Sequence, residues 1–233
     1  CPARAWRGNF RNFKSSRTRG DRESQSNHTH CMSHRLNISF FGSSLVSAYQ
    51  NYPVTYYRGL IRALSERGHR VTFYEPDTGD RLKRRDIPNP HWAKIVTYQD
   101  TDEAALDALE RAEESDLILK CSGIGVCDDL LEAAVLELKK PETLVAFLDV
   151  NAPATLARID SDPEDLFRPL ISEYDFIRTR GGGAPVVDAY VAAGAAECIP
   201  IYNALDTNLY FAVPPERRIE ADLALLNDPT PER

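Results

Sequence analysis

Short apolar runs alternate with amphipathic windows along the chain from residue 36 onward. Runs rich in Val, Ile, Leu and Phe predict seven strands, over residues 36–41, 70–74, 95–98, 116–120, 143–148, 175–179 and 197–202. Apolar residues at helical spacing predict helices near residues 54–67, 153–159 and 165–173, and one more after each of the third, fourth and sixth strands. Parallel neighbours need crossover connections, so this alternation predicts an α/β fold with a doubly wound, mostly parallel, seven-stranded Rossmann-like sheet.

The charge of the chain is unevenly divided. Residues 1–35 hold eight Lys or Arg against two Asp or Glu, whereas residues 36–233 hold 20 against 33. The first 35 residues also contain few aliphatic side chains, so they are predicted to be a disordered basic extension ahead of the folded domain. An acidic folded body does not attract a phosphate backbone, and we expect no nucleic-acid partner for it.

The basic extension contains two features of its own. The single methionine, Met32, stands directly before the first strand, and we interpret residues 1–31 as an upstream extension of the reading frame. His28, His30, Cys31 and His34 are residue types that bind metals. Because they lie close together in a segment predicted to be disordered, we expect no metal site there.

The five cysteines are odd in number and lack paired CxxC spacing. This pattern favours reduced thiols in a cytoplasmic protein. No apolar run approaches the roughly 18 residues that a membrane-spanning helix needs, so no transmembrane segment is expected.

Small, polar or acidic residues follow four of the predicted strands. In an open parallel sheet, ligands bind beyond the carboxyl ends of the strands, where small residues let a ligand approach backbone N–H groups. Glycines that only end strands are the alternative. The candidate binding residues at these ends, with two from the first long loop, are Gly42, Ser43, Ser44, Tyr49, Asn51, Ser122, Gly123, Asn151, Gly181, Gly182 and Gly183.

Asp149 ends the most continuously apolar strand and is the one catalytic candidate. A carboxylate there can act as a base or orient a hydroxyl group of a substrate. The alternative is a structural role, in which Asp149 or Asn151 caps the following helix.

Two common phosphate-binding motifs are absent. Residues 41–48 read FGSSLVSA, which is not the GxGxxG dinucleotide fingerprint, and the connection to the first helix is long. No GxxxxGK[ST] sequence occurs anywhere in the chain, which excludes P-loop chemistry.

Several segments resemble the N-terminal half of GT-B glycosyltransferases of group 1. They are residues 40–44 (FFGSS), 56–64 (YYRGLIRAL), 68–74 (GHRVTFY) and 199–206 (IPIYNALD), the last followed by an aromatic pair at Tyr210 and Phe211. The chain looks most similar to the spore-maturation (CgeB-like) glycosyltransferases. The resemblance extends from residue 36 to about residue 226.

This resemblance implies a division of labour between two domains. Residues 36–212 are expected to form a single half of a GT-B fold, which holds a small-molecule or glycan acceptor. Asn203 and Asp206 are expected at the interdomain junction, and residues 213–233 are expected to contain the linker and the start of a truncated C-terminal domain that binds the donor. The implied co-substrate is a nucleotide sugar, with no cofactor or metal, and the isolated chain is expected to be inactive.

Two other classes of function stay open on the residues alone. One is a nucleotide- or flavin-binding oxidoreductase, which the missing GxGxxG motif disfavours. The other is a non-catalytic, flavodoxin-like binding module, which the count of seven strands disfavours.

Overall fold

The computed structural model describes residues 34–49, 51–78, 80–203 and 211–214. The chain divides into two compact units, Cys1–Ser33 and His34–Arg233. The first unit lies outside the described residues, so the features below all belong to the second. Of the expected linker, residues 213–233, only Val213 and Pro214 are described, and the domain boundary stays a prediction.

Seven strands and five α-helices alternate along the described chain. The strands are β1 (Asn37–Phe41), β2 (Arg70–Asp77), β3 (Lys94–Gln99), β4 (Leu117–Cys121), β5 (Leu144–Asp149), β6 (Phe176–Thr179) and β7 (Cys198–Pro200). The helices are α1 (Val54–Glu66), α2 (Asp102–Glu110), α3 (Asp128–Ala134), α4 (Ala152–Ser161) and α5 (Gly183–Ala192). Three short 3₁₀ turns complete the set: η2 (Arg81–Arg84), η3 (Val135–Leu138) and η4 (Arg168–Leu170).

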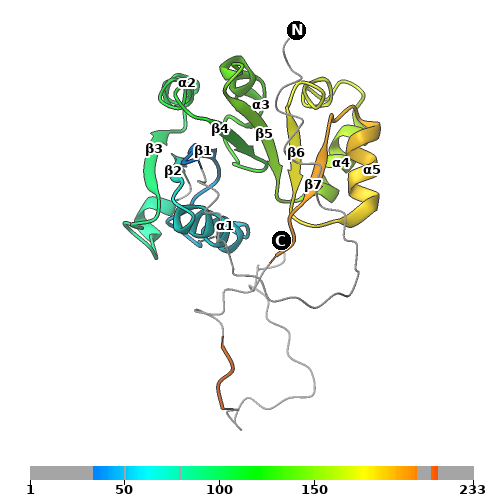
Figure 1. The fold of residues 1–233 in the computed structure, drawn as a ribbon. Coiled ribbons are helices and arrows are strands. Elements are labelled where there is room, and N and C mark those ends of the chain that lie inside the picture. The colour runs from blue at the N-terminus through cyan, green and yellow to red at the C-terminus, as the bar shows by residue number, and fades with distance from the viewer. Residues whose placement is uncertain (1–33, 50, 79, 204–210, 215–233) are drawn as a thin grey trace, which may run out of the picture. The chain divides into compact units, whose positions relative to one another are not determined.

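The strands form one sheet in the order β3-β2-β1-β4-β5-β6-β7, and every neighbouring pair is parallel (Figure 1). The predicted doubly wound Rossmann-like sheet is therefore confirmed. Pairing of β1 with β4 joins two runs of strands that extend in opposite directions from the centre of the sheet.

The helices cover the two faces of the sheet unequally. Tyr57 and Ile61 of α1 pack with Phe40, Phe73 and Leu119 on one face. Buried side chains of α2, α3, α4 and α5 pack with β4, β5 and β6 on the opposite face. In the described residues, none of these helices combines the length and apolar character needed to cross a bilayer.

Two details differ from the expected elements. The prediction of a helix near residues 165–173 is wrong, because only the short 3₁₀ turn η4 forms there. Pro169 lacks an N–H, and the Asp165 carboxylate instead accepts from the N–H groups of Phe167 (3.0 Å) and Arg168 (3.2 Å), which favours a turn.

The second strand is longer than expected and runs through Glu75 and Pro76 to Asp77. At this end β2 pairs only with β3, because β1 has already ended at Phe41. A proline is tolerated where no neighbouring strand needs its N–H. The extension places the Glu75 side chain at the carboxyl edge of the sheet.

Phe147 on β5 provides a test of the larger core. Its ring is fully buried, 4.4 Å from the ring centre of Phe167 and 5.6 Å from that of Tyr174. Phe147→Ala should lower the free energy of unfolding by about 3–5 kcal/mol, measured by urea denaturation. Leu166→Ala is the control, because Leu166 is 66% exposed, and it should change stability by less than about 0.5 kcal/mol. Equal effects of the two substitutions would contradict this packing.

Candidate functional site

The loops that follow β1 and β4 meet where the strand order reverses. β1 pairs with β2 on one side and with β4 on the other, and the chain runs away from this boundary in both directions. Ligands of open parallel sheets bind beyond the carboxyl ends of the strands at such a switch point. Residues 42–53 and 122–127 therefore frame the candidate site.

The loop between β1 and α1, described over residues 42–49 and 51–53, is held together by its own polar side chains. The Ser43 hydroxyl donates to the Asn51 side-chain oxygen (2.7 Å), and the Asn51 amide donates to the carbonyl oxygens of Ser44 (2.7 Å) and Ser47 (2.9 Å). These four side chains are buried. The predicted binding residues Ser43, Ser44 and Asn51 thus come together, and their mutual bonds shape the rim of the site.

Gly42 makes room for an aromatic ring. A Cβ at this position would lie 2.5 Å from Cζ of Phe73. The Phe73 ring is fully buried and packs 5.5 Å from the ring centre of Tyr57. The absence of a side chain after β1 therefore has a reason in core packing, independent of any ligand.

A second loop, residues 78–93, is fastened to the first. Arg58 of α1 makes two 2.7 Å bonds to the Asp86 carboxylate and a 2.9 Å bond to the Leu45 carbonyl oxygen. The ion pair with Arg58 lowers the pKa of Asp86. Tyr49, a predicted binding residue, lies beneath the guanidinium of Arg84 at 4.1 Å, a cation–π contact between the same two loops.

Glu75 and Arg81 are site residues that the sequence analysis missed. One oxygen of the buried Glu75 carboxylate accepts from the Leu45 N–H (2.6 Å) and the Ser44 hydroxyl (3.0 Å). Arg81 donates to the Ser43 carbonyl oxygen at 3.1 Å; burial lowers the pKa of Arg81, and the charge of Glu75 partly opposes that shift. The position of Glu75 directly after the predicted second strand could have indicated a site residue, but the sequence pattern was interpreted only as the end of that strand.

Four buried polar atoms among the described residues have no hydrogen-bond partner. They are the hydroxyls of Tyr56, Tyr57 and Tyr98 and the second carboxylate oxygen of Glu75. Burial raises the pKa of all four side chains, to about 12 for Tyr56. A buried polar group without a partner costs about 1–3 kcal/mol, so this edge of the sheet holds unmet hydrogen-bonding capacity.

Asp149 is the centre of a saturated network. Its carboxylate is fully buried and accepts from the Ser122 hydroxyl (2.8 Å), the Asn151 N–H (2.9 Å) and the Tyr190 hydroxyl. Burial, and secondarily the Asp149 charge, raises the pKa of Tyr190. Asp149 therefore ties the ends of β4 and β5 to helix α5.

The other predicted residues of this edge have distinct environments. The Ser122 hydroxyl also accepts from the Val150 N–H (2.9 Å), while Gly123 is exposed with a φ of +68°. Asn151 occupies the N-cap position of α4, but its side chain makes no capping hydrogen bond, so the capping role considered for that side chain is wrong.

Gly181, Gly182 and Gly183 form the turn from β6 into α5, with φ angles of +80°, +92° and +61°. L-residues with a side chain rarely adopt these angles. A Cβ on Gly182 would also lie 2.5 Å from Cγ2 of Val186.

A buried ion network on the α3 face was also missed. Lys120 is fully buried and pairs with Asp128 and with Glu132 (3.3 Å), and Glu132 pairs with Arg158 (3.2 Å). Burial raises the pKa of Glu132, while the charges of Lys120 and Arg158 oppose that shift. These ions satisfy one another, as a buried charge requires.

Two sets of predictions fall wholly or partly outside the described residues. Asn203 is described and exposed, whereas Asp206 is not described, so the interdomain junction stays a prediction. His28, His30 and Cys31 also lie outside the described ranges. Within those ranges, no group of three or more His, Cys, Asp or Glu side chains is arranged to hold a metal ion.

Comparison with known proteins identifies a shared fold. No protein-family model and no curated protein matches the chain. The crystal structure of Anabaena HepE in complex with UDP and glucose matches 77% of this chain with a TM-score of 0.51 and 16% identity. The match covers 47% of HepE, so the chain spans about half the length of that protein.

A second structure, the C-terminal domain of the coenzyme A biosynthesis bifunctional protein CoaBC, matches 54% of this chain and 68% of that domain. It does so at 10% identity with a TM-score of 0.35, which is too low to support an argument.

The contact between Gly42 and Phe73 predicts the effect of adding a methyl group. Gly42→Ala should lower stability by about 1–3 kcal/mol, because the new Cβ forces the buried ring to move. Gly59→Ala, inside α1 with nothing within 4 Å of its Cβ position, should instead raise stability by about 0.5–1 kcal/mol. Thermal unfolding of both variants distinguishes the two signs.

The raised pKa of Glu75 predicts a pH dependence. The folded state retains a proton that the unfolded chain releases, so Glu75 costs stability as the pH rises from its ordinary pKa of 4.5 through the raised value. The stability of Glu75→Gln relative to the unsubstituted protein should therefore increase between pH 4 and pH 7, measured by urea denaturation.

Glu113→Gln is the control for this experiment. The ion pair with Lys140 lowers the pKa of Glu113, so its relative stability should not increase over the same range. A flat profile for Glu75→Gln would contradict the burial of an uncompensated carboxylate oxygen.

Proposed function

We propose that this chain is the acceptor-side half of a GT-B glycosyltransferase of group 1, related to the CgeB-like enzymes. The observation that carries the proposal is the unpartnered carboxylate oxygen of Glu75, at the carboxyl end of β2 beside the loop that follows β1. The fold shared with about half of a protein that binds UDP and glucose supports it. In this proposal a second domain binds the nucleotide sugar, and the cysteine pattern favours the cytoplasm.

The chemistry of the unpartnered atoms suits a ligand rich in hydroxyl groups. Sugars and other polyols both donate and accept hydrogen bonds. Glu75 offers an acceptor near the carboxyl end of β2, and Tyr57 of α1 offers a hydroxyl, while Tyr98, near the end of β3, packs with the core of the opposite face. Because these atoms are buried, the loop of residues 42–53 has to shift before an acceptor can reach them.

Glu75 and Asp149 have different roles in the proposed reaction. A base of raised pKa is suited to take the proton of an acceptor hydroxyl as the sugar is transferred and the nucleoside diphosphate leaves. Glu75 has such a pKa and a free oxygen. The hydrogen bonds to Asp149 suit a positioning residue that fixes the rim formed by Ser122 and Asn151.

Binding to the chain of residues 1–233 tests this function. We expect a saccharide or polyol on a glycan and small-polyol array to bind, and UDP-glucose, NAD⁺ and FMN to show no comparable affinity in calorimetry. Glu75→Gln should weaken acceptor binding by about tenfold, because a charge-assisted hydrogen bond is lost. Tight binding of NAD⁺ or FMN, or no ligand on the array, would overturn the proposal.

Two tyrosine variants separate binding from stability. Tyr57→Phe removes a buried hydroxyl without an internal partner, so it should weaken acceptor binding and raise stability by about 1–3 kcal/mol. The Tyr174 hydroxyl donates to the Glu132 carbonyl oxygen at 2.7 Å. Tyr174→Phe should therefore lower stability by about 1 kcal/mol and leave acceptor binding unchanged.

A further inference from the structure

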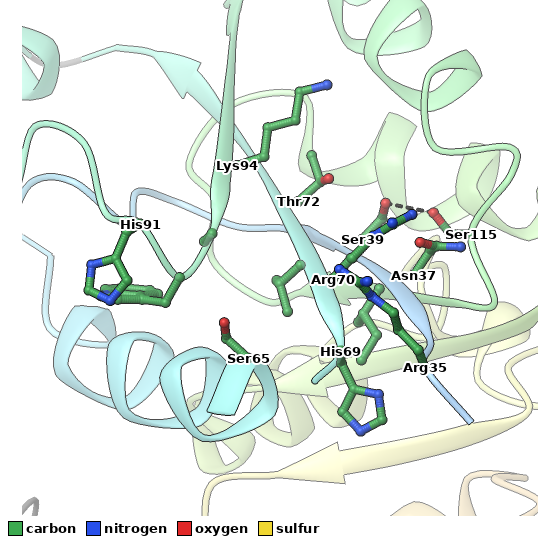
Figure 2. A pocket seen from close by; sticks show the side chains of 14 residues that line it. Arg35, Asn37, Ser39, Ser65, His69, Arg70, Thr72, His91, Lys94 and Ser115 are labelled. Atoms are coloured by element: carbon green, nitrogen blue, oxygen red, sulfur yellow. Dashed lines mark hydrogen bonds between the residues drawn. The ribbon is translucent and has the colours of Figure 1, made fainter. Parts of the chain in front are cut away.

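A pocket of about 360 Å³ lies at the amino ends of β1, β2 and β3 (Figure 2). Its lining comes from the starts of these strands, the end of α1 and the segments that precede β3 and β4. The strands are parallel, so this pocket and the proposed acceptor site lie at opposite ends of the sheet. It is a separate site that the proposed function does not use.

The sequence builds this pocket by placing polar residues where a central strand is usually apolar. Arg35, Asn37 and Ser39 alternate with apolar residues along the start of β1, so they share one face of the sheet. Asn37 pairs in register with Arg70, and Ser39 with Thr72. Strands buried on both faces read as continuous apolar runs, so this alternation indicates a face that is open at the amino end.

The lining is strongly basic. Five side chains with positive or imidazole groups line the pocket, namely Arg35, His69, Arg70, His91 and Lys94; in Figure 2, Arg70 and Lys94 extend from β2 and β3, whereas His69 and His91 belong to the segments that precede these strands. None of the described residues that line it is Asp or Glu. Asp116 accepts from the Asn37 N–H (2.7 Å) but is not part of the lining. The pocket is thus basic, although residues 36–233 as a whole carry more acidic than basic side chains.

Among the described residues, no carboxylate forms an ion pair with the Arg and Lys side chains of the pocket. Across the described ranges, Arg35, Arg70 and Lys94 form no ion pair, whereas Arg58 and Lys120 elsewhere in the fold do. A cleft lined by charges of one sign concentrates ions of the opposite sign. The arrangement therefore favours an anionic ligand.

The neutral groups of the pocket add further donors. Nδ1 of His69 accepts from the Leu36 N–H at 3.2 Å, so a neutral His69 carries its proton on Nε2 and can donate it to a ligand. The hydroxyls of Ser39 and Ser115 lie 2.8 Å apart at the buried end of the pocket. Guanidinium, ammonium and hydroxyl donors together match the oxygens of a phosphate group.

We infer that this pocket binds a phosphate dianion, either free or as the phosphate group of a small monoester. Its volume is at the lower end of the range for small-molecule sites, about 300–1,000 Å³. That volume accommodates a phosphate with a small organic substituent. Arg70 and Lys94 are assigned as the principal contacts, because they extend from neighbouring strands that pair in register at Thr72 and Lys94.

Calorimetric titration of the full chain with inorganic phosphate and with glycerol 3-phosphate, at constant ionic strength with chloride, tests this site. We expect saturable binding of one equivalent, and about tenfold or greater weakening in the double variant Arg70→Gln/Lys94→Gln. Lys94→Gln alone should have an intermediate effect, which protects the test if the double variant folds poorly.

Arg67→Gln/Lys140→Gln is the matched control, because it removes the same charge from exposed positions outside the pocket and should bind phosphate as the unsubstituted protein does. Binding that is absent, or equally weakened by both double variants, would overturn the inference. So would affinity for a single-stranded oligonucleotide that grows with its length, since that indicates a surface for a nucleic-acid backbone.

Discussion

The parallel pairing of β1 with β4 is the constraint on which the rest of the structure depends. It joins two runs of strands that extend in opposite directions, so the loops after β1 and β4 open beside each other. The hydrogen bonds of residues 42–53 and the network around Asp149 then stabilise the two sides of this opening. Without the pairing, Ser43 and Ser122 would belong to unconnected surfaces.

The fold could be predicted from the sequence because it depends on local patterns. Each strand is a short apolar run, and each crossover helix is an amphipathic window, so the seven strands and their mostly parallel arrangement follow from periodicity. The expected helix near residue 169 failed because a proline and a side-chain–backbone bond from Asp165 outweigh apolar spacing. The length of β2 beyond Tyr74 depends on where the neighbouring strand β1 ends, and the periodicity of apolar residues gives no information about that.

The candidate site was predicted less completely, since its contacts join residues distant in sequence. Ser43, Ser44 and Asp149 were predicted as candidates because they follow or end strands, and Asn51 because it lies in the first long loop, but their partners were not evident. Glu75 meets Ser44 and Leu45 across about 30 residues, and only the folded chain brings them together. The basic pocket was not predicted for another reason. The rule that ligands bind beyond the carboxyl ends of parallel strands does not apply to the amino ends, where this pocket lies.

The pairing of β1 and β4 also affects the order of folding. The Asn37 N–H meets the carboxylate of Asp116, 79 residues later in the chain. During synthesis, β1, α1 and β2 emerge well before β4, the strand that completes the centre of the sheet. Until β4 is available, their apolar faces lack part of their packing. Contacts of such long sequence separation slow folding and prolong the exposure of unpaired strand edges. The same pairing that assembles the site thus lengthens the time for which the nascent chain exposes aggregation-prone strand edges.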